Sequence, residues 1–119
     1  MKLRKNYTCP LELVHDIVKG KWKTILIFQL RNGKCSLSEL QRNIDGISQK
    51  MLIEQLSELK EFELIDKKSY EGFPLKVEYF LTPRGEKMLA SIKIMQEIGI
   101  EYMVEQGMTN FLDKKGICY

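Results

Sequence analysis

The sequence predicts a mainly α fold that carries one small β-hairpin. Apolar residues recur at the three- and four-residue spacing of amphipathic helices over most of the chain. Two short segments between residues 64 and 81 break this pattern, and the second alternates apolar and polar side chains as a half-buried strand does. With 119 residues, of which 44% are hydrophobic and 29% charged, the chain has the length and composition of one soluble globular domain.

Two helices are expected before residue 33. Apolar residues recur at helical spacing between Cys9-Pro10 and Gly20, which predicts a short first helix ending at the glycine. Residues 22–30 are apolar on nearly all sides, so they are expected to form a buried central helix closed by the turn at Asn32-Gly33. Trp22 follows this apolar pattern and is expected in the core or in a pocket beside a dimer interface.

The third helix is expected to begin at one of two serines. Ser36 with Glu39, and Ser38 with Gln41, each fit a capping box, in which a hydroxyl and a side chain three residues later satisfy free backbone amides. Asp45-Gly46 then predicts a tight turn.

A fourth helix is predicted over Ser48–Glu61, with Ser48 as its cap. Leu52, Leu56 and Leu59 form an inward stripe at positions i, i+4 and i+7. The side chains expected to face outward are Gln49, Lys50, Ile53, Glu54 and Ser57.

A hairpin and a long helix complete the prediction. The strands are expected at Leu64–Ser69 and Lys76–Leu81, joined by a six-residue tip. Thr82-Pro83 predicts the start of the last helix, because proline at the first helical position loses no hydrogen bond. This helix and the residues after it carry more apolar surface than the small core can cover, which predicts a homodimer. The residues concerned are Met88, Leu89, Ile92, Met95, Ile98, Tyr102, Val104, Met108, Phe111 and Leu112.

This order of elements is that of a winged helix-turn-helix. We therefore expect a single domain over residues 1–119. It comprises an N-terminal arm at 1–10, a DNA-binding core at about 11–82 and C-terminal dimerisation helices at about 83–115.

The charge distribution points to an anionic partner for the first part of the chain. Residues 1–50 hold ten Lys and Arg against four Asp and Glu, net +6, whereas residues 51–119 hold nine against twelve, net −3. In a helix-turn-helix the second helix of the pair enters the major groove of double-stranded DNA. We predict that Ser48, Gln49, Lys50 and Met51, together with Ser38, contact DNA; ordinary solvated polar residues are the alternative.

Several short motifs resemble the signature of the HxlR family over about Cys9 to Gly99. They are Cys9-Pro10, Gly20-Lys21-Trp22, Gly46-Ile47-Ser48-Gln49-Lys50-Met51-Leu52, Leu56-x-x-Leu59, Val77-Glu78-Tyr79 and Leu81-Thr82-x-x-Gly85. The resemblance implies a homodimeric winged-helix regulator related to the MarR group, more often a repressor, that reads a palindromic operator.

The wing departs from that family at its tip. Glu71 and Leu75 stand where prolines are usual, so its stiffness and contacts are open. Lys76, and less directly Lys67 and Lys68, can place positive charge on the DNA backbone or in the minor groove; solvated strand lysines are the alternative.

Three widely spaced cysteines lack the spacing of a zinc or redox motif. The family resemblance implies that Cys9 senses oxidants or electrophiles. The start of a helix, with Lys2, Arg4 and Lys5 before it, would favour its reactive thiolate. Cys118 is either the resolving thiol of the other subunit or an exposed bystander, and Cys35 is taken as a bystander in a turn.

We expect neither a cofactor nor a metal, and we do not expect the protein to be an enzyme. A thiol enzyme using Cys9 with His15 lacks an orienting group and an oxyanion site. Apolar stretches are short and no signal core follows the basic start, so a cytoplasmic protein away from membranes is expected. A winged-helix module that binds proteins instead of DNA remains the second hypothesis, which the basic first half disfavours.

Overall fold

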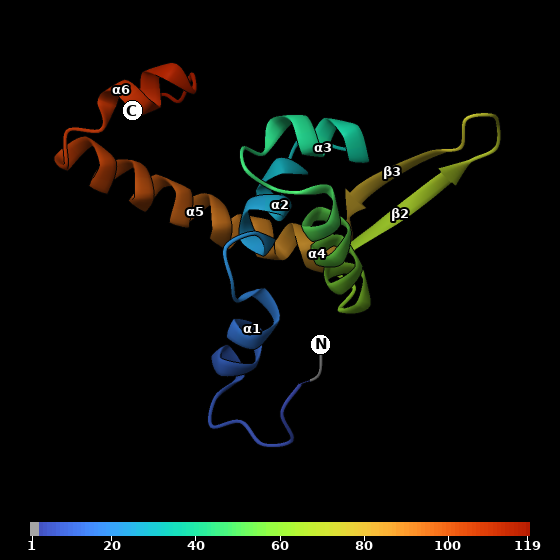
Figure 1. Ribbon diagram of the computed structural model, residues 1–119. Helices are drawn as coiled ribbons and strands as arrows, with labels where there is room; N and C mark the ends of the chain where they lie inside the picture. The colour runs from blue at the N-terminus through green and yellow to red at the C-terminus, as the bar shows by residue number, and fades with distance from the viewer. Residues whose placement is uncertain (1–2) are drawn as a thin grey trace. The chain divides into compact units, whose positions relative to one another are not determined.

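The structure is a computed structural model, and it describes residues 3–119. Its helices and strands lie in the order α1 Pro10–Val18, α2 Lys23–Gln29, β1 Cys35–Ser36, α3 Leu37–Asn43, α4 Gln49–Glu61, β2 Ile65–Tyr70, β3 Lys76–Leu81, α5 Pro83–Glu105 and α6 Thr109–Lys114 (Figure 1). The mainly α fold with a β-hairpin wing is thereby confirmed. None of the helices between Leu3 and Tyr119 combines the length and hydropathy that crossing a bilayer requires.

The chain forms two compact units, one up to Leu89 and the other at Ala90–Tyr119. The first unit holds α1 to α4, the sheet and the beginning of α5. The second holds the rest of α5 and α6, with Leu112 buried within the residues described there.

The core of the first unit lies where α2 contacts both α3 and α4. Its buried apolar side chains come mostly from these helices and the residues that end them: Leu26, Ile27, Leu30, Leu40, Ile44, Ile47, Leu52, Leu56, Leu59, Leu64, Ile65 and Leu89. The predicted inward stripe of α4 is therefore confirmed. The central helix is less uniformly buried than predicted, because Ile25 is exposed and Trp22 is only half-buried.

The predicted starts of three helices are confirmed in detail. Ser36, rather than Ser38, caps α3, and its hydroxyl and the Glu39 carboxylate form both bonds of the capping box. The Ser48 hydroxyl accepts a hydrogen bond from the Met51 amide at 3.1 Å. At the start of α5, the Thr82 hydroxyl accepts one from the Gly85 amide at 3.1 Å.

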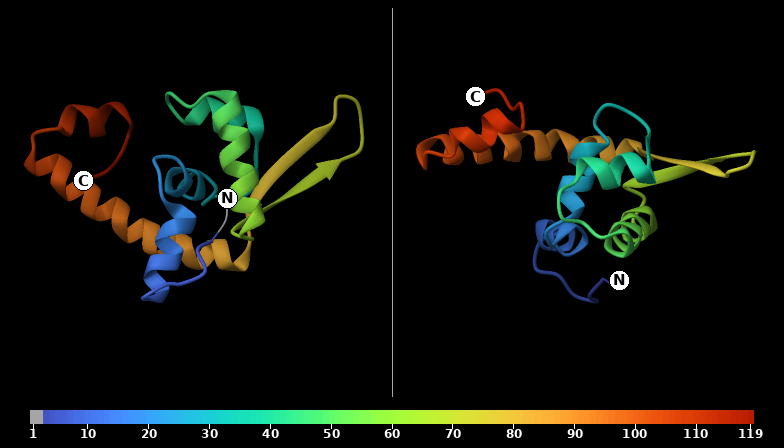
Figure 2. Two further views of the ribbon diagram at one scale, coloured as in Figure 1. Left: turned by 60° about the horizontal axis from the view of Figure 1, so that its bottom comes forward. Right: turned by 45° about the horizontal axis from the view of Figure 1, so that its top comes forward.

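The sheet has three antiparallel strands in the order β1-β3-β2. β2 and β3 form the predicted hairpin, in register from Ile65 opposite Leu81 to Tyr70 opposite Lys76. The hairpin leaves the helices and ends in a free tip (Figure 2). β1 was not predicted: Cys35, expected in a turn, pairs with Tyr79, and Ser36 pairs with Glu78.

Candidate nucleic-acid interface

The first turn of α4 presents three consecutive polar residues to solvent. Ser48, Gln49 and Lys50 are all exposed. Because the Ser48 oxygen accepts the Met51 amide, its O–H remains a free donor for an external acceptor. The predicted outward face continues along the helix, where Ile53, Glu54 and Ser57 are exposed too.

Met51 is less available than the sequence suggested. Its side chain is half-buried, and its sulfur lies 3.5 Å from the Gln55 side-chain amide, which donates to it. The methionine therefore lies at the side of the exposed turn, with part of its surface turned towards the protein.

The turn between α3 and α4 is held by a side-chain bond. The Gln41 amide donates to the Ile47 carbonyl at 2.6 Å, and Gly46 adopts the positive φ of +84° that the tight turn requires. Ile44 and Ile47, on either side of this turn, are buried. The side-chain bond and the two buried isoleucines hold the turn in place, so the orientation of α4 relative to α3 is defined where α4 begins.

The other predicted DNA-contacting residues lie on neighbouring elements. Ser38 is exposed in the first turn of α3, 3.2 Å from the hydroxyl of Ser36. Lys76 is exposed at the start of β3, 3.9 Å from the Glu78 carboxylate and 5.7 Å from the centre of the Tyr70 ring. Lys68 lies 5.1 Å from the same ring, so two lysines flank Tyr70 near the end of the hairpin.

This arrangement has close parallels among known proteins. The sequence profile of the HxlR-like helix-turn-helix family matches residues 17–107. The chain belongs to this family. It is 40% identical over 94 residues to YkvN, an uncharacterised HTH-type transcriptional regulator of Bacillus subtilis, covering 79% of this chain and 77% of that protein.

Solved structures agree with the fold of this HxlR-like protein. A MarR-family transcriptional regulator from Porphyromonas gingivalis is 41% identical, with a TM-score of 0.77 over 84% of this chain and 98% of that one. The redox regulator HypR in its reduced form is 34% identical, with a TM-score of 0.76 over 85% and 99%. Its oxidised form is 36% identical, with a TM-score of 0.75 over 78% and 96%. This HxlR-like protein is accordingly a transcriptional regulator with a DNA-binding helix-turn-helix.

Cys9 lies at the start of α1, as the sequence predicted. It is the N-cap residue, its thiol is exposed, and its side chain makes no capping bond. Pro10 at the first helical position has no N–H, and the Glu12 amide donates to the Cys9 carbonyl at 3.0 Å.

Arg4, one of the basic residues before Cys9, pairs with two carboxylates of α1. Its guanidinium forms ion pairs with Glu12 at 2.6 Å and with Asp16 at 2.8 Å. The Tyr7 hydroxyl also donates to Asp16, at 2.9 Å. These contacts tie the arm to α1, while Lys2 lies outside the described residues.

The remaining cysteines differ in accessibility. Cys35 is half-buried, and burial raises the pKa of its thiol, with Glu39 and Glu78 adding to the effect. Cys118 is exposed and follows α6 in the second unit. Among residues 3–119 no group of His, Cys, Asp and Glu side chains is arranged to hold a metal ion.

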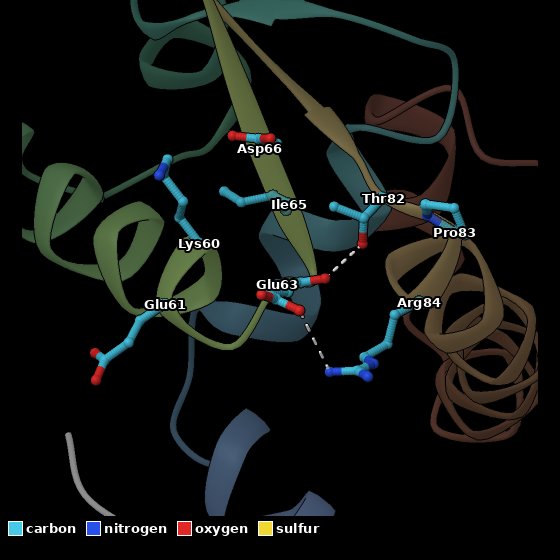
Figure 3. A pocket seen from close by; sticks show the side chains of 8 residues that line it. All are labelled: Lys60, Glu61, Glu63, Ile65, Asp66, Thr82, Pro83 and Arg84. Carbon is cyan, nitrogen blue, oxygen red and sulfur yellow. Dashed lines mark hydrogen bonds and ion pairs between the residues drawn. The ribbon is translucent and has the colours of Figure 1, made fainter.

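An open hollow of about 570 Å³ lies where α4, β2 and α5 meet (Figure 3). Lys60 and Arg84 share it with three carboxylates, those of Glu61, Glu63 and Asp66. Arg84 lies 4.0 Å from Glu63, and the Thr82 hydroxyl donates to the Glu63 carbonyl at 2.6 Å. The mixture of charges gives this hollow no preference for an anion, and it serves as the junction between the hairpin and α5.

The sequence analysis missed one buried charge that contacts α4. Lys23, in the apolar segment assigned to the central helix, is buried and forms an ion pair with Glu58 of α4. The only signal was a lysine within an otherwise apolar run, which equally fits an exposed helix position.

Proposed function

We propose that this protein is a sequence-specific repressor that binds a palindromic operator as a homodimer. The observation that carries the proposal is the exposed first turn of α4, which holds Ser48, Gln49 and Lys50. It follows directly after the turn that side-chain hydrogen bonds fix between α3 and α4. Gln49 is suited to base edges in the major groove, and Ser48 and Lys50 to phosphates. Ser38 and the wing residue Lys76 add contacts on either side.

The dimer is proposed to form through the second unit. Large apolar side chains are exposed there, among them Ile94, Met95, Ile98, Tyr102 and Phe111. Apolar surface of this extent is typical of a protein interface. A two-fold dimer would present two α4 helices to half-sites about one helical turn of DNA apart.

The test is a fluorescence-anisotropy titration of labelled upstream DNA in the presence of excess unrelated DNA. Tight binding that resists the competitor is expected. Gln49→Ala should weaken binding to the operator by about 1–3 kcal/mol and leave binding to unrelated DNA unchanged. Lys50→Ala should weaken both and lower the salt slope by about one. Lys60→Ala, at the exposed far end of α4, removes the same charge away from the first turn and is the matched control for Lys50→Ala. It should not lower the salt slope in the same way.

Failure of the protein to prefer any DNA, including sequences selected from a random pool, would remove this proposal. The exposed turn would then be an ordinary solvated helix start, and a protein-binding role for the fold would take precedence.

We further propose that Cys9 makes the regulator respond to oxidants or electrophiles. Support comes from its exposure at the α1 N-terminus and from the likeness to HypR, which is described as a redox regulator. In the oxidised state Cys9 would join Cys118 of the partner subunit, two thiols losing two protons and two electrons to the oxidant. The new bond would change the spacing of the two α4 helices and hence the affinity for DNA.

Cys9→Ser and Cys118→Ser proteins test this response. Cys9→Ser should keep DNA binding and lose the effect of a disulfide oxidant, while Cys35→Ser serves as the control thiol. Mass spectrometry of the non-reduced wild-type protein should show a dimer linked through Cys9 and Cys118. A full oxidant response in the Cys9→Ser protein contradicts the proposal.

A further inference from the structure

Lys23 is a buried ammonium at the first position of α2. It is 4% exposed and is the one charged residue buried among residues 3–119. Its Nζ lies 2.7 Å from the carboxylate of Glu58, whose side chain is 31% exposed. A charge withdrawn from water needs a close partner of opposite sign. The pair therefore joins the central helix to α4, the helix that presents the exposed turn.

Stability alone does not require a charge at this position. Buried ion pairs can usually be replaced by apolar side chains of similar volume without loss of stability. The neighbours Leu26 and Ile27 on α2 show that the core around this helix is otherwise apolar. An ion pair differs from an apolar contact because it restricts both the distance and the direction between its groups, so its specific contribution is to the placement of α4.

The contacts of α2 reach both ends of α4. Trp22, adjacent to Lys23, places its ring edge 4.0 Å from where a Cβ of Gly46 would stand, in the turn before α4. Lys23 holds Glu58 in the second half of the same helix. The N-cap of α2 and its first residue thus contact the turn before α4 and α4 itself at two separated points.

Three half-buried side chains lie along α4 between the ion pair with Lys23 and the exposed first turn. Met51, Gln55 and Glu58 lie on one side of α4, at i, i+4 and i+7, and all three are half-buried. The Gln55 amide donates to the Met51 sulfur at 3.5 Å. Rotation of α4 about its axis would break the ion pair and move Gln49 and Lys50 together.

We propose that Lys23 is a positioning residue for DNA recognition. Through Glu58 it sets the rotation and axial position of α4, and hence where Gln49 and Lys50 meet the base edges, without touching DNA itself. The inference rests on the proposed function, since it assumes that α4 is the helix that reads sequence.

The experiment begins with duplexes enriched from a random pool by the wild-type protein. Dissociation constants are then measured for one selected duplex and for its scrambled counterpart. The double variant Lys23→Met/Glu58→Leu should keep a thermal midpoint at or above that of the wild type. Its affinity for the selected duplex should fall about tenfold or more, while its affinity for the scrambled duplex and its salt slope stay unchanged.

Two further variants separate positioning from packing and from charge. Lys23→Arg retains a positive charge for the ion pair with Glu58. It should keep most of the wild-type discrimination between the selected and the scrambled duplex. Lys60→Met, exposed in the last turn of the same helix and away from its first turn, also removes one positive charge and should leave the ratio between the two duplexes as it is in the wild type. The neutral polar pair Lys23→Gln/Glu58→Gln, which leaves no buried charge without a partner, covers the case in which the first double variant does not fold, with a smaller but still selective loss expected.

An unchanged ratio between the two duplexes in every folded variant would overturn this inference and leave the proposed function standing. Failure of the wild-type protein to enrich any sequence would overturn both. A lower thermal midpoint with unchanged discrimination would assign the pair a purely structural role, which likewise contradicts the inference.

Discussion

Gly85 lies against the backbone carbonyl of Leu64 so closely that a Cβ atom at residue 85 would overlap the carbonyl oxygen. The same oxygen accepts the Thr82 amide at 3.1 Å, so it cannot turn away without losing that bond. The first turn of α5 is therefore packed directly onto the start of β2, and the Leu-Thr-x-x-Gly motif marks this junction.

Gly85→Ala is expected to lower the free energy of unfolding by about 2 kcal/mol. The clash with the Leu64 backbone should outweigh the gain of about 1 kcal/mol in helix propensity. Urea unfolding followed by circular dichroism measures the change. Gly99→Ala is the control in the same helix, because a Cβ there meets nothing within 4 Å, and it should stabilise the protein. A Gly85→Ala protein as stable as Gly99→Ala would contradict the close approach.

Ser48→Ala is expected to cost about 1 kcal/mol of stability, because the Met51 amide loses its acceptor at the start of α4. Thermal and urea unfolding should both report the loss. Ser57→Ala, exposed in the interior of the same helix, should be neutral or slightly stabilising. Equal effects of the two substitutions would show that the cap bond contributes nothing.

Ile98→Glu is expected to convert a dimer to a monomer, because it places a charge within the exposed apolar surface of the second unit. Sedimentation velocity measures the change. Ile53→Glu is matched in exposure, with Ile53 at 47% and Ile98 at 46%, but lies on α4. It should leave the protein dimeric, and a monomeric wild-type protein would refute the proposed interface.

The arm should detach from α1 in acid. The Arg4 guanidinium, with help from Tyr7, lowers the pKa of Asp16 below its ordinary 3.8. The hydroxyl and amide of Thr8 lower the pKa of Glu12 below 4.5, with Arg4 contributing less. Lowered carboxyl pKa values mean that the contacts stabilise the folded arm above about pH 5 and are lost as the pH falls through those values.

A titration of the two side-chain carboxyl groups by NMR checks this expectation. In Arg4→Gln the pKa of Asp16 should rise towards 3.8, whereas Glu12 should keep most of its lowering because Thr8 is its main partner. If Asp16 of the wild-type protein titrates at or above 3.8, the ion pair with Arg4 is not formed in solution.

Local signals predicted the helices and their ends well. Ser48, Thr82 and the turn at Gly46 were identified because a cap or a tight turn depends on residues only a few positions apart. Leu52, Leu56 and Leu59 were assigned to the core because helical spacing alone places them on one face. The positions of Gln49 and Lys50 on the exposed turn follow from the same spacing.

Features that depend on distant partners were not predicted. β1 contains only two residues, and Cys35 adopts strand conformation because it pairs with Tyr79 of β3. Arg4 was expected to act on Cys9, and its ion pairs with Glu12 and Asp16 on α1 depend on how the arm folds back against that helix.

The sequence by itself determined the order of the elements, the helix caps, the inward stripe of α4 and which residues form its exposed first turn. All of these depend on residue type and local spacing. Only the tertiary structure decided that Lys23 is buried against Glu58 and that Gly85 meets the Leu64 carbonyl. Lysine tolerates either water or a buried partner, and which of them Lys23 meets depends on Glu58, a residue 35 positions further along the chain.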